Sequence, residues 1–184
     1  MPRKFPSITF TNSVKAAQAR YHSRANGARF EQSEADDGHL GPAETEFLQE
    51  RDGFYLATVN EDGWPYVQFR GGPPGFVKVL DSTTLAYADF RGNRQYISTG
   101  NVFANDRVSL FFMDYATQRR LKVLSRATVV DAEEDAGLLA AVALGDYKAT
   151  VERVVRLEVV AFDWNCPQHI TPRFTLAEVR EMEL

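Results

Sequence analysis

The chain has one cysteine, no long apolar run and no surplus of positive charge, and each of these absences excludes a class of protein. A single cysteine, Cys166, cannot form a disulfide within the chain. No stretch is long and apolar enough to span a bilayer, and the N-terminal residues lack the apolar run of a signal peptide. A formal net charge of −4 argues against nucleic acid or an anionic membrane as partner. The sequence therefore predicts a cytoplasmic protein.

Familiar catalytic motifs are missing as well. The sequence holds no P-loop, no Gly-x-Gly-x-x-Gly after a predicted strand and no Gly-x-Ser-x-Gly. Cys166 and His169 have the spacing of half a metal site, but only His22 and His39 remain as further ligands of that kind, which argues against a closed zinc site. A thiol nucleophile would need an activating base, and a histidine on the same loop is weak evidence for one. We therefore predict no metal site and assign no catalytic residue.

What is present suits one domain preceded by an arm. The 184 residues are 44% hydrophobic, enough for a filled core. Residues 1–40 form the predicted N-terminal arm, with a helix over residues 13–24 capped by Ser13 and an acidic loop behind it. Residues 41–184 form the predicted main domain, which begins with a helix whose first turn holds Pro42. We expect the arm to pack on this domain or on a partner subunit.

The main domain has the apolar pattern of strands from residue 53 onward. Strands are predicted at residues 54–59, 64–69, 76–80, 84–88, 108–113, 121–130 and 151–162. Short helices are predicted after the turn at residues 91–95, within residues 131–145 and at residues 175–182. Because the joins are short, neighbouring strands should run antiparallel. The sequence therefore predicts a mainly β (α+β) fold, an antiparallel barrel with short helices at the joins.

The turn Arg91-Gly92-Asn93-Arg94 precedes one of these helices and is a candidate phosphate site. Guanidinium groups and the free N–H groups of a helix start are the donors that bind phosphate. An ordinary solvated turn is the alternative. Arg70 stands directly before Gly71 and Gly72, where it could reach a ligand across the sheet, or could equally form a surface ion pair.

Three further features could contribute to a binding site. Lys78 alternates with apolar neighbours and should face outward, to solvent or to a bound anion. The pair Arg119-Arg120 adds positive charge before a long strand, or forms a solvated face. The stretch 162–174 places Trp, Asn, Gln, His and Arg around two prolines, which is typical of a ligand lid or an interface arm.

In combined order these pieces resemble the FMN-binding split barrel of the pyridoxamine 5′-phosphate oxidase-like family. The resemblance covers residues 44–175. It rests on Tyr55-Leu-Ala-Thr-Val-Asn-Glu-Asp-Gly63 with Pro65, then Arg70, Leu85-Ala-Tyr-Ala-Asp89, the arginine-containing turn, Asn105-Asp-Arg-Val-Ser-Leu110, Asp163-Trp164 and Pro172-Arg-Phe174.

The resemblance implies that FMN lies at the interface of a homodimer. The implied cofactor-binding residues are Arg70, Gly71, Lys78, Tyr87, Ala88, Asn93, Arg94, Gln95, Arg120, Trp164 and Arg173. Among these, Arg94 with Gln95 would hold the phosphate. Trp164 and Arg173 would come from the opposite subunit.

The chain also departs from the family. Past Val130 we find no Tyr, Arg and Ser set like the one that grips pyridoxal phosphate. We therefore expect an FMN-dependent oxidoreductase that transfers hydride to or from another small-molecule substrate. Two alternatives stay open: a flavin-binding sensor or carrier without turnover, and a haem-binding split barrel with His169 as ligand. The sequence also leaves open another flavin, such as a deazaflavin.

Overall fold

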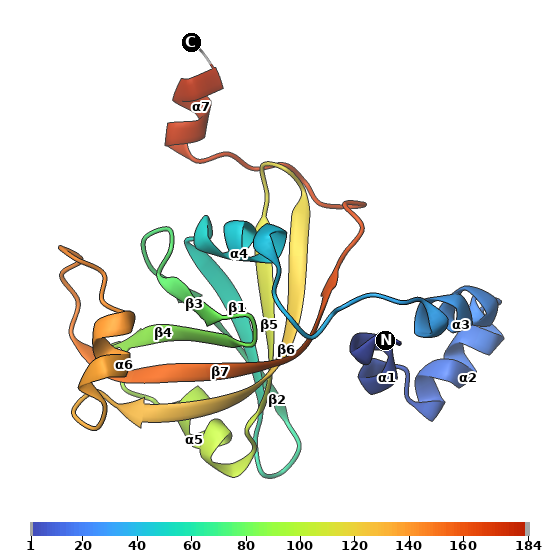
Figure 1. Ribbon diagram of the computed structural model, residues 1–184, viewed down its shortest axis with the longest axis horizontal. Coiled ribbons are helices and arrows are strands. Elements are labelled where there is room, and N and C mark those ends of the chain that lie inside the picture. Colours follow the sequence, from blue (N-terminus) through green and yellow to red (C-terminus); the bar gives the residue numbers. More distant parts are fainter. Residues whose placement is uncertain (1, 183–184) are drawn as a thin grey trace.

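The computed structural model describes residues 2–182 (Figure 1). Its helices are α1 (Lys4–Thr9), α2 (Asn12–Arg20), α3 (Arg24–Gln32), α4 (Pro42–Gln49), α5 (Ile97–Ala104), α6 (Ala136–Ala141) and α7 (Leu176–Met182). Its strands are β1 (Gly53–Val59), β2 (Pro65–Gly71), β3 (Val77–Asp81), β4 (Thr84–Phe90), β5 (Arg107–Asp114), β6 (Arg119–Asp131) and β7 (Val151–Trp164).

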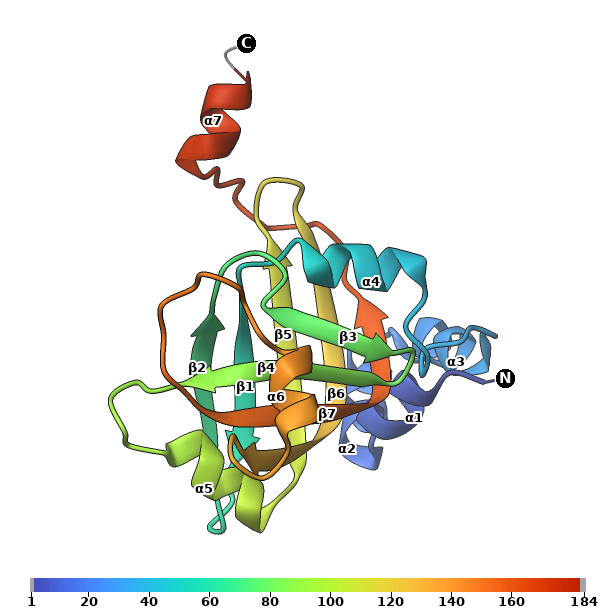
Figure 2. The same cartoon turned by 60° about the vertical axis from the view of Figure 1, so that its left-hand side comes forward.

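The strands form one antiparallel sheet in the order β2-β1-β5-β6-β7-β4-β3. In both ribbon views β3, β4 and β7 cross the direction of β1, β2 and β5, so the sheet curls around its core (Figures 1 and 2). β2 and β3 are the two ends of the strand order and do not pair with each other. This arrangement confirms the predicted antiparallel split barrel, and its opening lies between β2 and the end of the sheet that holds β3 and β4.

The core fills the inside of the curl because side chains alternate between the two faces of each strand. In β5 every second residue is buried, including Leu110 and Phe112. Phe54 of β1 is at the centre: its ring lies 4.9 Å from that of Phe112, 5.3 Å from that of Tyr87 and 5.9 Å from that of Phe76. Burial of such a side chain stabilises the fold by about 1.5–3 kcal/mol.

The N-terminal arm is more helical than predicted. The single helix predicted over residues 13–24 is wrong: α2 ends at Arg20, and the chain turns at His22, whose φ is 60°. The cap is Thr11 instead of Ser13, since the Thr11 side chain accepts a hydrogen bond from the backbone N–H of Val14. α1 and α3 were not predicted. The buried Asp37 accepts hydrogen bonds from the first N–H groups of α1, which fastens the arm beside β7 (Figure 1).

The helix predicted within residues 131–145 is shorter, because β6 continues to Asp131 and pairs there with β7. α6 begins at Ala136, after Asp135, whose side chain accepts a hydrogen bond from the N–H of Leu138.

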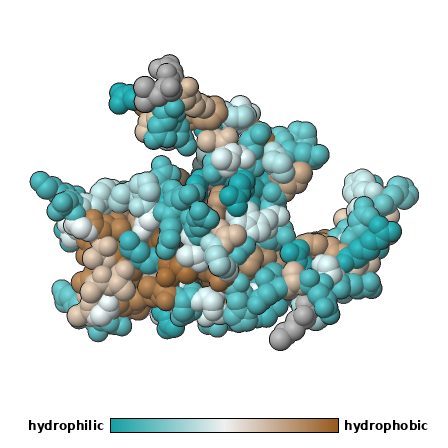
Figure 3. Space-filling view, turned by 45° about the horizontal axis from the view of Figure 1, so that its top comes forward, coloured by the Kyte–Doolittle hydropathy of each residue, from teal (hydrophilic) through white to brown (hydrophobic). Residues whose placement is uncertain are grey.

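Figure 3 shows apolar surface gathered on the side where Figure 1 places α6, β3 and β4. α7 projects from the body in both ribbon views (Figures 1 and 2). Among residues 2–182 no helix has the length and apolarity needed to cross a membrane.

Candidate functional site

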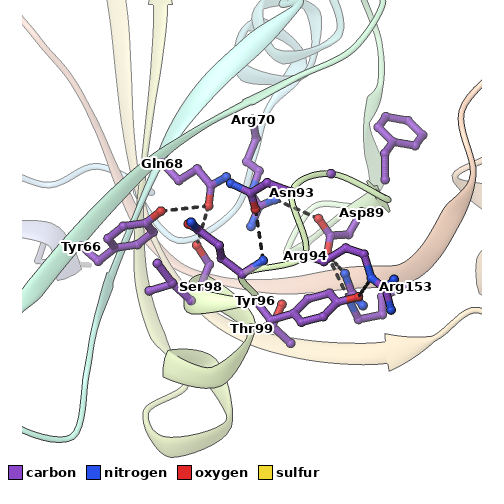
Figure 4. A pocket seen from close by; sticks show the side chains of 14 residues that line it. Tyr66, Gln68, Arg70, Asp89, Asn93, Arg94, Tyr96, Ser98, Thr99 and Arg153 are labelled. Atoms are coloured by element: carbon purple, nitrogen blue, oxygen red, sulfur yellow. Dashed lines mark hydrogen bonds and ion pairs between the residues drawn. The ribbon is translucent and has the colours of Figure 1, made fainter.

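The candidate site lies at the opening of the barrel, where polar residues continue the rows of side chains that form the core. Along β4 the row passes from Tyr87 to Asp89, and along β7 from Val155 to Arg153. On β2 the matching row ends at Arg70. Arg70 Nη1 donates to Asp89 Oδ1 at 2.9 Å, and thus connects the edge strand β2 to β4 across the opening (Figure 4).

Asp89 is shared between two arginines. Its second oxygen accepts hydrogen bonds from Arg153 Nε at 3.0 Å and Arg153 Nη2 at 2.8 Å. The Asp89 side chain is only 5% exposed, and a charge buried to this degree is costly unless it is paired and hydrogen-bonded, as it is here. Buried charges of this kind are costly when one partner is removed, and Asp89 therefore fixes both guanidinium groups firmly.

The predicted phosphate turn borders the same cavity and has an unusual backbone. Arg94 and Tyr96 have φ values of 61° and 54°, a left-handed conformation that is uncommon for residues other than glycine. The turn is held by hydrogen bonds: Gln95 N donates to Asn93 Oδ1, Arg94 Nε to the Tyr96 hydroxyl, and that hydroxyl to Glu152 of β7. A strained backbone that its surroundings hold in place is frequent at ligand sites.

Together these elements enclose a cavity of about 150 Å³. It is lined by Tyr66, Gln68, Arg70, Asp89, Phe90, Gly92, Asn93, Arg94, Gln95, Tyr96, Ile97, Ser98, Thr99 and Arg153. The first turn of α5 is part of this lining, and the first N–H groups of a helix have no partner within the helix. Three arginines face one carboxylate, so the charged lining residues leave two positive charges in excess. This donor set suits a phosphate group.

A second cavity of about 160 Å³ adjoins the first, with Arg70 between the two. Gly71, Tyr87 and Ala88 line it. The Tyr87 ring belongs to the core, and its buried hydroxyl has no hydrogen-bond partner within residues 2–182. Burial raises the pKa of Tyr87, so this hydroxyl stays protonated. The structure thus brings together at the opening the predicted residues of β2 and β4 and those of the turn.

Two other predicted residues lie elsewhere. Arg120 and Arg173 line a separate hollow of about 360 Å³, together with Tyr55, Tyr115 and His169. Arg120 Nη2 donates to the carbonyl of Cys166 at 3.0 Å, and the Arg173 guanidinium lies 5.2 Å from the centre of the Tyr115 ring. A hydrogen bond with the hydroxyl of Tyr55 raises the pKa of Tyr115, and burial adds to it. Among residues 2–182 this hollow shares no lining residue with the cavity at Arg94.

The last two predicted residues, Lys78 and Trp164, line neither cavity at Arg70. Lys78 is half-buried on β3, opposite Ala86. Trp164 donates from Nε1 to Glu44 of α4 at 2.7 Å, and its ring meets that of Phe47 edge-on at 4.8 Å. The chain's own α4 thus contacts this side chain, and a cofactor contact by Trp164 stays a prediction.

Asp89 and Arg153 were not predicted to act at the site, although the sequence contains a signal for each. Asp89 is an acid at the end of an otherwise apolar strand, and Arg153 interrupts the apolar run at the start of β7. Only the register, which sets Asp89 opposite Arg153, connects the two.

Comparison with known proteins agrees with this fold. The pyridoxamine 5′-phosphate oxidase family model matches residues 40–163. A putative pyridoxamine 5′-phosphate oxidase from Lactobacillus delbrueckii has a TM-score of 0.53 at 22% identity, over 70% of this chain and 96% of that one. HupZ from Group A Streptococcus has a TM-score of 0.55 at 18% identity, over 73% of this chain and 100% of that one. A search of curated proteins found no match.

At these identities the solved structures support the fold and carry no conclusion about ligands. The family model, in contrast, matches the sequence of residues 40–163, well over half of the 184 residues. That match confirms the resemblance read from the sequence: the chain belongs to the pyridoxamine 5′-phosphate oxidase family.

Proposed function

We propose that the protein binds FMN non-covalently, with the phosphate in the cavity at Arg70, Arg94 and Arg153. The observation that carries this proposal is the excess of two positive charges at the start of α5. A phosphate monoester carries close to two negative charges at neutral pH and accepts several hydrogen bonds. The arginines of the cavity and the first N–H groups of α5 supply both.

The chemistry of the proposed oxidoreductase is hydride transfer, which bound FMN would supply; the protein binds, orients and tunes it. In this proposal Arg94 and the α5 start hold the phosphate, and Arg70 lies beside the cavity that Tyr87 and Ala88 line. Arg120 and Arg173 place positive charge in the second hollow. A cation near the pyrimidine edge of a flavin favours its anionic reduced form by Coulomb attraction.

A homodimer would bring that hollow to the cofactor. The support is an apolar outer face on β1 and β2, where Val67 and Phe69 are 59% and 57% exposed and Tyr55 is 38% exposed. The β1–β2 turn adds Trp64, which is 73% exposed. Exposed apolar groups of this size on a sheet face are typical of an interface. Tyr55 also lines the hollow that holds Arg120 and Arg173, so a partner seated on this face would cover it.

The test is a titration of purified, ligand-free protein with FMN and with riboflavin, followed by flavin fluorescence. We expect FMN to bind more tightly than riboflavin, since riboflavin lacks the phosphate. Protein that takes up neither flavin would refute the proposal. Anaerobic mixing of the FMN complex with a reduced nicotinamide then separates an enzyme, whose flavin bleaches, from a flavin carrier without turnover.

Haem is the second candidate ligand, and one observation favours it: His169 lines the 360 Å³ hollow together with Arg120 and Arg173. A haem carboxylate would suit Arg120 or Arg173 by charge. Absorption spectra of the protein after addition of haem and of FMN distinguish the two. A Soret band that disappears in His169→Ala would favour haem, whereas flavin bands that depend on Arg94 favour the main proposal.

A further inference from the structure

Arg153 is a half-buried cation at the candidate phosphate site that neither the sequence nor the family resemblance assigns. Its side chain is 13% exposed and lines the cavity together with Arg70 and Arg94. It comes from β7, a central strand of the sheet, whereas Arg94 stands on an exposed turn. Groups on a rigid strand are positioned more precisely than groups on a loop.

Contacts on three sides fix the orientation of Arg153. Two of its nitrogens donate to Asp89 Oδ2, and the Tyr96 ring centre lies 4.7 Å from the guanidinium carbon (Figure 4). The third contact is with Glu152, whose Oε2 lies 3.1 Å from Nη2. Burial by itself would lower the pKa of Arg153, but the contacts with Asp89, Tyr96 and Glu152 together outweigh it, so the pKa is raised. Arg153 is therefore charged whenever the protein is folded.

Arg153 decides the net charge of the residues that line the cavity. With Arg153 present, the charged lining residues carry two positive charges in excess, which matches a phosphate dianion. Without it the excess falls to one, which matches a monoanion. Arg153 itself has two acidic neighbours, and each of them also pairs with another arginine. Asp89 pairs with Arg70, and Glu152 pairs with Arg91 at 2.7 Å, so counting Glu152 and Arg91 together leaves the excess at two. The Asp89 carboxylate thus holds two arginines beside each other that would otherwise repel.

We infer that Arg153 is a third phosphate-binding cation of this cavity, that Asp89 positions it, and that it selects the dianionic form of a phosphate monoester. The inference rests on the proposed function only for the flavin attached to that phosphate. The charged or titratable groups that face Arg153 are Arg70 from β2, Asp89 from β4, Arg94 and Tyr96 from the turn and Glu152 from β7.

The test compares three variants with the wild type. Arg153→Gln removes the charge and leaves Asp89 paired with Arg70, whereas Arg153→Lys keeps the charge. Arg126→Gln is the control, because Arg126 is exposed and its ion pair is with Asp106 on the surface. Melting temperatures establish that each variant is folded. Flavin fluorescence then gives the dissociation constants of FMN and riboflavin at pH 5 and pH 8, on either side of the second phosphate pKa near 6.

In the wild type and Arg126→Gln we expect FMN affinity to rise between pH 5 and pH 8. In Arg153→Gln, FMN affinity at pH 8 should fall about tenfold to hundredfold, the effect of one charge-assisted hydrogen bond, and its rise with pH should flatten. Arg153→Lys should keep that rise, and riboflavin binding should not change in either variant. A purely structural role for Arg153 would weaken both flavins alike and leave the pH profile intact.

The result that overturns the inference is a folded Arg153→Gln variant with wild-type FMN affinity and pH profile, or an Arg153→Lys variant whose pH profile flattens; the proposed function would survive either. Phenyl phosphate, a probe without a flavin, separates the reverse case. If the wild type binds no flavin but phenyl phosphate raises its melting temperature, and does so in Arg126→Gln but not in Arg153→Gln, the proposed function fails and the inference stands. No thermal shift with phenyl phosphate and no FMN binding would refute both.

Discussion

The contact between Trp164 and Glu44 gives a prediction that decides between two roles for the indole. The family resemblance places Trp164 at a cofactor on the opposite subunit, whereas in the structure its Nε1 donates to Glu44 of the same chain at 2.7 Å. Trp164→Phe keeps an aromatic ring against Phe47 and removes the donor. A hydrogen bond to a charged acceptor contributes about 1.5–3 kcal/mol, and since this one is half-buried we expect a loss of about 1.5–2 kcal/mol.

Such a loss is measurable in a chain of this size. It corresponds to a fall of roughly 3–8 °C in melting temperature, at about 2–4 °C for each kcal/mol. Urea unfolding of Trp164→Phe, Glu44→Ala and the double variant gives a coupling energy, which should be of the same size as the loss in Trp164→Phe. Glu44 also accepts a hydrogen bond from Gly41 N at 3.0 Å, so Glu44→Ala carries a cost of its own that the cycle subtracts.

FMN affinity is measured on the same preparations. If the indole only fastens α4 to the end of β7, FMN binding by the folded fraction should be unchanged. The reasoning would be wrong if Trp164→Phe left stability and coupling at zero while FMN affinity fell tenfold or more. That outcome would place the indole at the cofactor, as the resemblance implies.

Four further predictions follow from other parts of the molecule. Arg94→Ala should weaken FMN about tenfold to hundredfold and leave riboflavin unaffected, by fluorescence titration; equal losses would make Arg94 a structural residue of the turn. Phe69→Glu should convert a dimer of about twice 20.7 kDa to a monomer in sedimentation; an unchanged dimer would exclude this face as the interface. Burial alone would raise the pKa of Asp114, but hydrogen bonds within its turn and the nearby Arg51 lower this pKa below its usual 3.8. The ionised carboxylate therefore stabilises the fold above that pH, and this stabilisation is lost as the pH falls through the lowered pKa. Asp114→Asn should flatten the fall of the urea midpoint below about pH 4. Arg173→Ala should leave the melting temperature of ligand-free protein unchanged and should weaken FMN or lower the flavin potential; no change in either would exclude Arg173 from the site.

Local chemistry was enough to predict most of the barrel. Alternating apolar residues predicted each strand to within two residues of its observed ends, since the period of two is set by the strand itself. Pro42 predicted the start of α4 for an equally local reason. The arm shows where this approach ends. Nothing near Arg20 in the sequence stops the helix as a glycine or proline would, and the break depends on the left-handed turn at His22 and on Phe30 of α3 packing against Phe10.

The part of the candidate site that comes from one contiguous segment was predictable from the sequence. The part that the register of strand pairing brings together was not. The turn at Arg91–Gln95 stands out because its polar residues are contiguous. Arg153 meets Asp89 only because β7 pairs with β4 in a register that sets these two residues opposite each other, and β7 follows β4 by some 60 residues in the sequence. A sequence without aligned relatives cannot fix such a register, because a shift by two keeps the same face buried.

The two groups of predicted cofactor residues pose a final geometric question. The resemblance assigns Arg94 and Arg173 to one FMN, yet in the single chain they line separate cavities without a shared residue. If both assignments are right, the second cavity must reach the first through another copy of the chain. The exposed face of Tyr55, Val67 and Phe69 offers that contact, since Tyr55 belongs both to the apolar face and to the hollow with Arg173. A mixed dimer then gives a sharp test. Homodimers of Arg94→Ala or of Arg173→Ala should have two impaired FMN sites. In a heterodimer of the two variants, one site combines both substitutions and the other has neither, so one of the two sites should bind FMN normally.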